Sequence, residues 1–221
     1  MIGERPVVKI CGLTRVADAE LALQTGARYL GVIMAGGPRQ VTRAQAREIF
    51  AVAPATARVV VFADQTLDDV VRVADELELA AVQLHAGATP EAMEWLRART
   101  PAARWAVVRV PADQWPRDEV HAIAESADAL VLDAKVDGAL GGTGVALPWR
   151  QVADAVSTWR RRYATTRLVL AGGLRADRVS EAVRWLSPDV LDVSSGVEHA
   201  PGIKDPDRVR AFLHAVEHLH D

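Results

Sequence analysis

The feature of this sequence that most constrains its fold is a regular alternation of short apolar runs with amphipathic stretches. Each run is rich in β-branched residues and is bounded by turn residues, which is typical of strands buried in a parallel sheet. Two of the amphipathic stretches begin with helix-start signals, at Thr42 and at Thr89-Pro90. The predicted strands are Val7–Cys11, Tyr29–Met34, Ala57–Phe62, Ala80–Leu84, Arg104–Val110, Ala129–Asp133, Arg167–Ala171 and Val190–Val193. The predicted helices are Ala17–Thr25, Arg43–Ala53, Leu67–Leu77, Pro90–Arg99, Arg117–Ser126, Trp149–Arg162, Ala176–Leu186 and Asp207–His220.

Eight β-α units in succession predict the α/β class and, within it, a (β/α)8 TIM barrel of eight parallel strands with outer helices. The 221 residues fit the usual size of that fold, and no linker-like segment divides them, so residues 1–221 are expected to form one domain. The alternative is an open doubly wound sheet. It uses fewer strands and usually has a glycine-rich turn after the first one, where this chain has "CGLTR".

Composition excludes several classes of protein. The formal net charge of -3 and the pI of about 6.1 give no reason to expect nucleic acid as a partner. A single cysteine can form neither an internal disulfide nor a thiolate metal cage. No apolar run approaches the ~20 residues that cross a membrane, and no secretory signal is recognisable, so a cytoplasmic protein is expected.

The functional residues of a (β/α)8 barrel lie at the C-terminal ends of its strands, and Cys11 ends the first of them. Strand side chains alternate, so Lys9 and Cys11 share one face while Val8 and Ile10 share the face that packs on helices. A free cysteine is often only a buried apolar residue. A nearby cation, however, lowers the pKa of a thiol. We therefore expect Cys11 to be a catalytic base or nucleophile, with Lys9 as the possible activator of its thiol.

Asp133 ends the sixth predicted strand and precedes a long segment, residues 134–148, that contains four glycines. No helix follows closely enough for Asp133 to cap it. A carboxyl in a partly apolar pocket can keep its proton and act as a general acid. Long loops in compact domains are often lids, so residues 134–148 are either a lid or a surface excursion.

The turns after the seventh and eighth predicted strands are candidates for phosphate binding. In (β/α)8 barrels these two loops commonly bind phosphate through backbone N–H groups. The alternative is two tight turns without a ligand. The residues concerned are Gly172, Gly173, Ser194, Ser195 and Gly196.

Three further side chains are candidates for substrate contacts. Arg39 follows "GGP" in the second loop and could bind a carboxylate through two parallel hydrogen bonds, although most arginines are simply solvated. Gln83 and His85 could donate hydrogen bonds at the same rim. By contrast, no metal site is predicted, because the spaced histidines of the last helix (His214, His218, His220) lack acidic or cysteine partners.

Motifs spread in order over nearly the whole chain resemble those of the phosphoribosylanthranilate isomerase family, which catalyses the third step of tryptophan biosynthesis. They are "KICGLTR", "PRQV", "VQLH", "VLD" with "GGTG", "LAGGL" and "DVSSGVEHAPGIKD". Two positions depart from the family pattern. Gly37 stands before Pro38 where serine is usual, and Ala86-Gly87-Ala88 follows "VQLH" where Gly-Asp or Gly-Glu is common.

The resemblance implies an Amadori rearrangement of N-(5-phosphoribosyl)anthranilate to 1-(2-carboxyphenylamino)-1-deoxyribulose 5-phosphate. It implies Asp133 as the general acid, Cys11 as the general base, and no metal or cofactor. It also implies Arg39 as the ligand of the anthranilate carboxylate, and the two turns described above as the phosphate site. Asp192, which belongs to the same final motif, could pair with Lys9 across the neighbouring strands.

Partners follow from the same resemblance: a small phosphosugar substrate, no nucleic acid, no membrane, and a monomer or homodimer. Two rival functions stay open. One is the related aminoaldose isomerase of histidine biosynthesis, which uses a pair of aspartates where this chain has Cys11 and Asp133. The other is a phosphosugar-binding sensor that has lost catalysis, against which the presence of both Cys11 and Asp133 argues.

Overall fold

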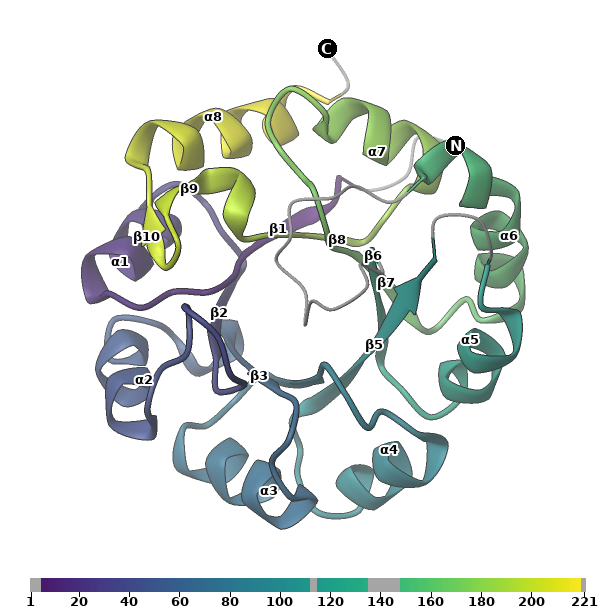
Figure 1. Ribbon diagram of the computed structural model, residues 1–221, viewed down its shortest axis with the longest axis horizontal. Coiled ribbons are helices and arrows are strands. Elements are labelled where there is room, and N and C mark those ends of the chain that lie inside the picture. Colours follow the sequence, from purple (N-terminus) through teal and green to yellow (C-terminus); the bar gives the residue numbers. More distant parts are fainter. Residues whose placement is uncertain (1–4, 112–114, 135–147, 220–221) are drawn as a thin grey trace.

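The computed structural model describes residues 5–111, 115–134 and 148–219, and its eight parallel strands close into a barrel surrounded by helices (Figure 1). The strands are β1 (Val7–Ile10), β2 (Tyr29–Ile33), β3 (Arg58–Phe62), β4 (Ala81–Leu84), β5 (Ala103–Val110), β6 (Ala129–Ala134), β7 (Arg167–Leu170) and β8 (Val190–Val193). They pair in sequence order, and β1 pairs with both β2 and β8. The closed ring confirms the predicted (β/α)8 barrel and excludes the open doubly wound sheet.

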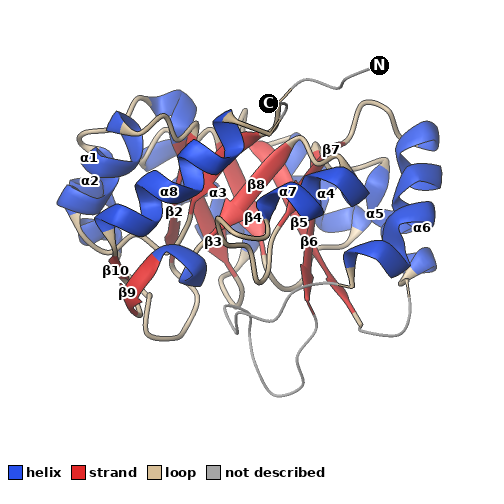
Figure 2. Cartoon of the chain, turned by 90° about the horizontal axis from the view of Figure 1, so that it is seen from above, coloured by secondary structure: helices blue, strands red, loops and turns tan. Residues whose placement is uncertain are grey.

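The helices alternate with the strands and cover the outside of the barrel (Figures 1 and 2). They are α1 (Val16–Gln24), α2 (Arg43–Phe50), α3 (Leu67–Glu76), α4 (Pro90–Arg97), α5 (Arg117–Ala124), α6 (Trp149–Arg162), α7 (Val179–Leu186) and α8 (Pro206–Glu217). Three of them begin at a threonine whose hydroxyl accepts a hydrogen bond from the first turn, at Thr42, Thr66 and Thr89. These caps satisfy amide groups that have no partner within the helix.

The predicted elements agree with the structure to within three residues at every end. One of the three-residue shifts is at the start of α7. That helix begins at Val179 instead of Ala176, because Arg175–Arg178 form a turn closed by a hydrogen bond from Arg178 N to Arg175 O. Four short elements were not predicted: the 3-10 helices η1 (Ala55–Ala57) and η2 (Ser195–Val197), and the antiparallel pair β9 (Glu198–Ala200) and β10 (Ile203–Lys204). Such short segments carry no usable periodicity.

Two apolar cores hold the barrel together. The larger lies between the strands and the helices and contains Val8 and Ile10, as alternation in β1 predicts. The smaller fills the barrel interior, where the rings of Tyr29 and Trp105 pack edge to face at 5.1 Å. These side chains fill the interior of the barrel, and the cavity lies at the C-terminal ends of the strands. That is the usual position of the active site in this fold.

Among the residues that the structure describes, no helix combines the length and apolar character that a membrane span requires.

Candidate active site

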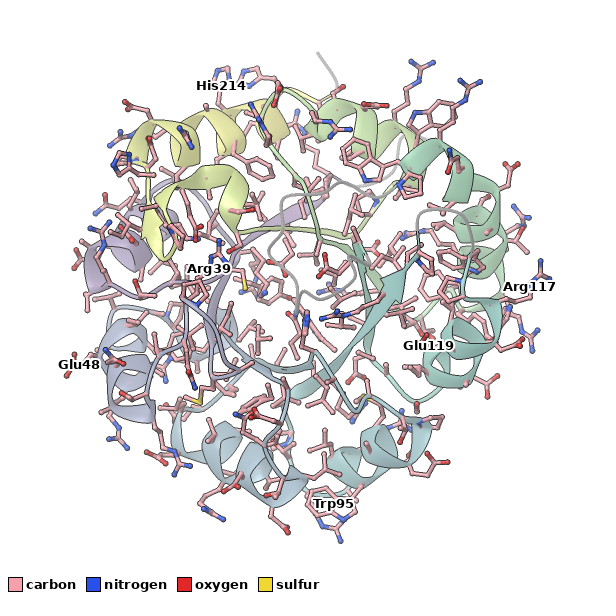
Figure 3. All side chains as sticks on the ribbon, in the orientation of Figure 1. Arg39, Glu48, Trp95, Arg117, Glu119 and His214 are labelled. Atoms are coloured by element: carbon pink, nitrogen blue, oxygen red, sulfur yellow. The ribbon has the colours of Figure 1, made fainter. Side chains whose placement is uncertain are left out.

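The predicted site residues converge on one cavity of about 400 Å³ at the C-terminal ends of the strands. All of them line it except Lys9, which is fully buried and bonded to Asp192 of the lining. The lining includes Cys11, Arg39, Gln83, His85, Asp133, Gly172, Gly173, Asp192, Ser194, Ser195 and Gly196. In Figure 3, Arg39 lies inside the ring of helices, whereas Glu48, Trp95 and His214 lie on its outer side.

Lys9, Cys11 and Asp192 form a buried ionisable group at the junction of β1 and β8. Lys9 is fully buried, and its Nζ donates a hydrogen bond of 2.8 Å to Asp192 Oδ2, which is the pairing the sequence predicted. Gly31 of β2 makes room for this group. A Cβ atom there would lie 2.9 Å from Cys11 Sγ and 2.9 Å from Lys9 Cε. The thiol and the ammonium group therefore share the space that the missing side chain leaves.

Charge and burial oppose each other at the thiol. Burial raises the pKa of Cys11, the Lys9 ammonium lowers it, and the Asp192 carboxylate raises it again, so the pKa stays above its ordinary value. Burial alone would lower the pKa of Lys9, but the charges of Asp192 and Cys11 outweigh it and raise that pKa. Lys9 thus stays charged and favours the thiolate, without making the thiolate the dominant form.

Asp133, at the end of β6, is only 8% exposed, and its Oδ1 accepts a 2.9 Å hydrogen bond from Ala134 N. Burial raises the pKa of Asp133 to about 6, and the charge of Asp192 adds to that rise. The Ala134 amide, Arg109 and Lys9 pull in the opposite direction but do not cancel the effect. The protonated carboxyl is therefore present in a useful fraction near neutral pH, which a general acid requires.

The turns after β7 and β8 meet above the barrel. Gly172 and Gly173 have φ values of 81° and 63°, which only glycine adopts readily. A side chain at Gly196 would collide with the carbonyl oxygen of Leu174, so glycine allows the two loops to touch. Backbone amides of both loops thus border one part of the cavity, as a phosphate site of this fold requires.

Several buried polar atoms that border the cavity have no partner among the described residues. They are Gln83 Oε1, Asp192 Oδ1 and Ser194 Oγ. Because a buried polar atom without a hydrogen bond is costly, these atoms mark where a polar ligand would bind. His85 instead contacts Arg109, with Nε2 and Nη2 2.7 Å apart.

Sequence reasoning missed two residues beside Arg39. Glu198 and Lys204 are 5% and 2% exposed, and both come from the β9–β10 hairpin. Arg39 Nε and Nη2 donate to Glu198, with shortest distances of 2.8 and 2.7 Å, and Lys204 Nζ donates to Glu198 Oε1 at 2.8 Å. The available signal was that both charges belong to the final sequence motif. Their meeting with Arg39 depends on a hairpin too short to predict.

Two other sequence predictions concern the long segment after Asp133 and the histidines of the last helix. Of the segment 134–148, which was predicted as a lid or a surface excursion, residues 135–147 lie outside the described residues, as does His220. His214 and His218 stack with ring centroids 4.1 Å apart, and His218 Nδ1 lies 2.8 Å from the His214 carbonyl oxygen. The described part of the chain holds no cluster of three or more His, Cys, Asp or Glu suited to a metal ion.

A closed barrel whose open end gathers a buried carboxyl, a thiol and two turns that meet at a glycine is typical of a (β/α)8-barrel enzyme. Residues 8–215 match the family model described as N-(5'phosphoribosyl)anthranilate (PRA) isomerase. Among curated relatives, the N-(5'-phosphoribosyl)anthranilate isomerase of Chromohalobacter salexigens is 39% identical over 97% of this chain and 96% of its own. That of Paracoccus denitrificans is 40% identical over 93% and 94%.

Solved structures agree with these matches. The phosphoribosyl anthranilate isomerase of Thermus thermophilus superposes with a TM-score of 0.78 at 34% identity, over 97% of this chain and all of that one. A phosphoribosyl anthranilate isomerase in complex with reduced 1-(o-carboxyphenylamino)-1-deoxyribulose 5-phosphate superposes with a TM-score of 0.78 at 27% identity, over 96% and 99%. The chain belongs to the N-(5'-phosphoribosyl)anthranilate isomerase family, and it is an isomerase of tryptophan biosynthesis.

Proposed function

We propose that this chain carries out its isomerisation by general acid–base catalysis, with Asp133 as the acid and Cys11 as the base. The observation that carries this proposal is the buried Asp133 carboxyl, whose pKa of about 6 leaves it protonated in part at neutral pH in the cavity that Cys11 also lines. Asp133 belongs to β6 and Cys11 follows β1, so the two groups approach a ligand from different parts of the rim.

In this mechanism Asp133 donates its proton to the furanose ring oxygen of N-(5-phosphoribosyl)anthranilate, and the ring C–O bond breaks to give a protonated Schiff base. The Cys11 thiolate then removes the C2 proton, and the electron pair of that C–H bond neutralises the iminium nitrogen. The resulting enolamine tautomerises to 1-(2-carboxyphenylamino)-1-deoxyribulose 5-phosphate. Lys9 supports the base by lowering the pKa of the thiol.

The rest of the cavity supports a phosphosugar substrate that carries a carboxylate. Arg39 would bind the anthranilate carboxylate, and backbone amides at Gly172, Gly173, Ser195 and Gly196 would bind the phosphate. Buried oxygens at Gln83, Asp192 and Ser194 would hydrogen-bond the polar parts of the substrate. His85 would add a contact at the same rim. A relative of this chain has been solved with a reduced product analogue that contains a phosphate and a carboxyphenyl group.

Steady-state kinetics test these roles. Cys11→Ala and Asp133→Asn should each lower kcat by roughly two to four orders of magnitude, because each removes a proton-transfer group, while KM changes little. Arg39→Ala should mainly raise KM. Turnover near the wild-type value in either catalytic variant would reject the assignment, and an unchanged KM would remove Arg39 from the site.

Rival functions predict different results in the same assays. An isomerase of the histidine pathway would turn over its own aminoaldose, but the first strand of this chain is followed by Cys11 and not by an aspartate. A sensor without catalysis would bind product and fail to complement a tryptophan auxotroph that lacks this isomerase. Measuring both aminoaldoses, and complementation, separates the three possibilities.

Assembly and location belong to the same proposal. One structural relative consists of mutually generated monomers of a dimeric phosphoribosylantranilate isomerase from Thermotoga maritima, with a TM-score of 0.79. We accordingly expect this chain to be a monomer or a homodimer that works in the cytoplasm on a small phosphosugar. Light scattering of the purified protein and cell fractionation test the two statements.

A further inference from the structure

A buried cluster of three charges stands at the edge of the cavity, formed by Arg39 of the second loop and by Glu198 and Lys204 of the β9–β10 hairpin. Glu198 Oε1 accepts hydrogen bonds from Arg39 Nε, from Lys204 Nζ at 2.8 Å and from Gly202 N at 3.2 Å, and Oε2 accepts from Arg39 Nη2. Both oxygens of the Glu198 carboxylate thus accept hydrogen bonds, and both cations donate to them. So many bonds to one buried carboxylate fix its position.

The way Arg39 is held decides which of its N–H groups face the cavity. A guanidinium group has two edges that can each bind a carboxylate, one formed by Nε and Nη2 and one formed by Nη1 and Nη2. Glu198 occupies the first edge. No hydrogen bond from Arg39 Nη1 to another described residue is seen, and Arg39 lines the cavity. The second edge is therefore the one that a ligand can reach.

Glycine at position 12 completes the arrangement. A Cβ atom at Gly12 would lie 2.7 Å from Arg39 Cδ, so the aliphatic stem of Arg39 lies directly against the backbone that follows Cys11. Lys204 links the cluster to the turn after β8, because its Nζ also donates to the carbonyl oxygen of Ser194 at 3.3 Å. The cluster therefore lies against the backbone that follows Cys11 and is bonded to the turn after β8.

We propose that Glu198 is a positioning residue for substrate binding: it clamps the inner edge of Arg39 and, held by Lys204, turns the outer edge toward the substrate carboxylate. This inference rests on the proposed role of Arg39 as the carboxylate ligand and assigns a residue outside that proposal. Glu198 is not among the residues that line the cavity, whereas Arg39 is. It acts through Arg39, so its loss should weaken binding of the carboxylate end and leave the chemical step nearly intact.

The test compares Glu198→Gln with the wild-type enzyme. KM should rise by about tenfold, as expected when a charge-assisted pair no longer orients the anchor, while kcat stays within about twofold. Binding of two fragments then locates the effect. Anthranilate should bind more weakly to the variant, and inorganic phosphate should bind as it does to wild type. Equal weakening of both fragments would show that Glu198 only supports the loop, and would overturn the proposal.

Combining the variant with Arg39→Ala separates this inference from the proposed function. Glu198→Gln should add no further rise in KM when Arg39 is already absent. If Arg39→Ala leaves KM unchanged, Arg39 does not bind the substrate carboxylate, and the role proposed for Glu198 is rejected together with that assignment. If Arg39→Ala raises KM but Glu198→Gln does not, only the positioning role is wrong.

Two more variants guard against a folding defect. Glu198→Asp keeps the negative charge that buried Lys204 needs but shortens the side chain by one methylene, so it should show the same selective loss of anthranilate binding. Asp128→Asn breaks another arginine–carboxylate pair, with Arg104, outside the cavity, and should leave both kinetic constants unchanged. Full recovery of the wild-type KM in Glu198→Asp would count against an orienting role.

Discussion

Replacing Asp133 by asparagine should stabilise the folded protein at neutral pH while it removes the proposed general acid. Asp133 is 8% exposed, and burial raises its pKa from 3.8 to about 6. The folded protein thus binds this proton more tightly than the unfolded chain does. The stability that this carboxyl contributes is highest below pH ~4, falls as the pH rises towards 6, and is constant above that. Above pH ~6 the charged side chain is a net cost.

The size of that cost follows from the shift. A rise of about 2 pKa units corresponds to about 3 kcal/mol, because each unit is worth 1.36 kcal/mol. Asparagine has nearly the same shape and carries no charge, so Asp133→Asn should regain up to about 3 kcal/mol near pH 7.5 and well under half of it near pH 4. In a domain of this size that gain corresponds to a rise in Tm of roughly 6–12 °C.

Urea denaturation of wild type and variant at both pH values measures the difference. Asp207→Asn is the matched control, since it makes the same substitution at a carboxyl that is 96% exposed and paired only with Arg210 in the described part of the chain. The reasoning is refuted if Asp133→Asn is no more stable than wild type near pH 7.5. It is also refuted if the gain is the same at both pH values, because a pH-independent effect would come from packing instead of ionisation.

Three further outcomes are expected. The proposed active form has protonated Asp133 and the Cys11 thiolate, so it carries one proton on the two groups together. The pH profile of kcat/KM should therefore rise to about pH 6, stay level, and fall only where the thiol titrates. A fall that begins near pH 6 would contradict this. Lys9→Met should move the alkaline limb to higher pH, since the ammonium lowers the thiol pKa, and an unchanged limb would remove Lys9 as activator. Gly31→Ala should lower kcat, and it should lower the free energy of unfolding by about 1–3 kcal/mol, because its Cβ would press on Cys11 and Lys9. If calorimetry and turnover of the variant match those of the wild type, the space at Gly31 is not needed.

The sequence by itself determined the barrel and predicted many of the residues that line the cavity. Buried strands and surface helices differ in hydrophobic period, and a period is a local property that survives without tertiary information. Alternation along β1 and the residue that follows it placed Lys9 and Cys11 on the inner face. Closure of the eight units then placed β8 beside β1, which brings Asp192 to Lys9. These steps need only periodicity and strand order.

The tertiary structure alone decided which charges meet and how strongly each group is buried. Glu198 lies 159 residues from Arg39 in the chain, and the hairpin that carries it has strands of three and two residues, too short for any pattern. Likewise, no sequence pattern gives the pKa of Asp133, because burial and distant charges set it. The proposed mechanism depends on a few such groups, and they are desolvated only after the chain has folded around them.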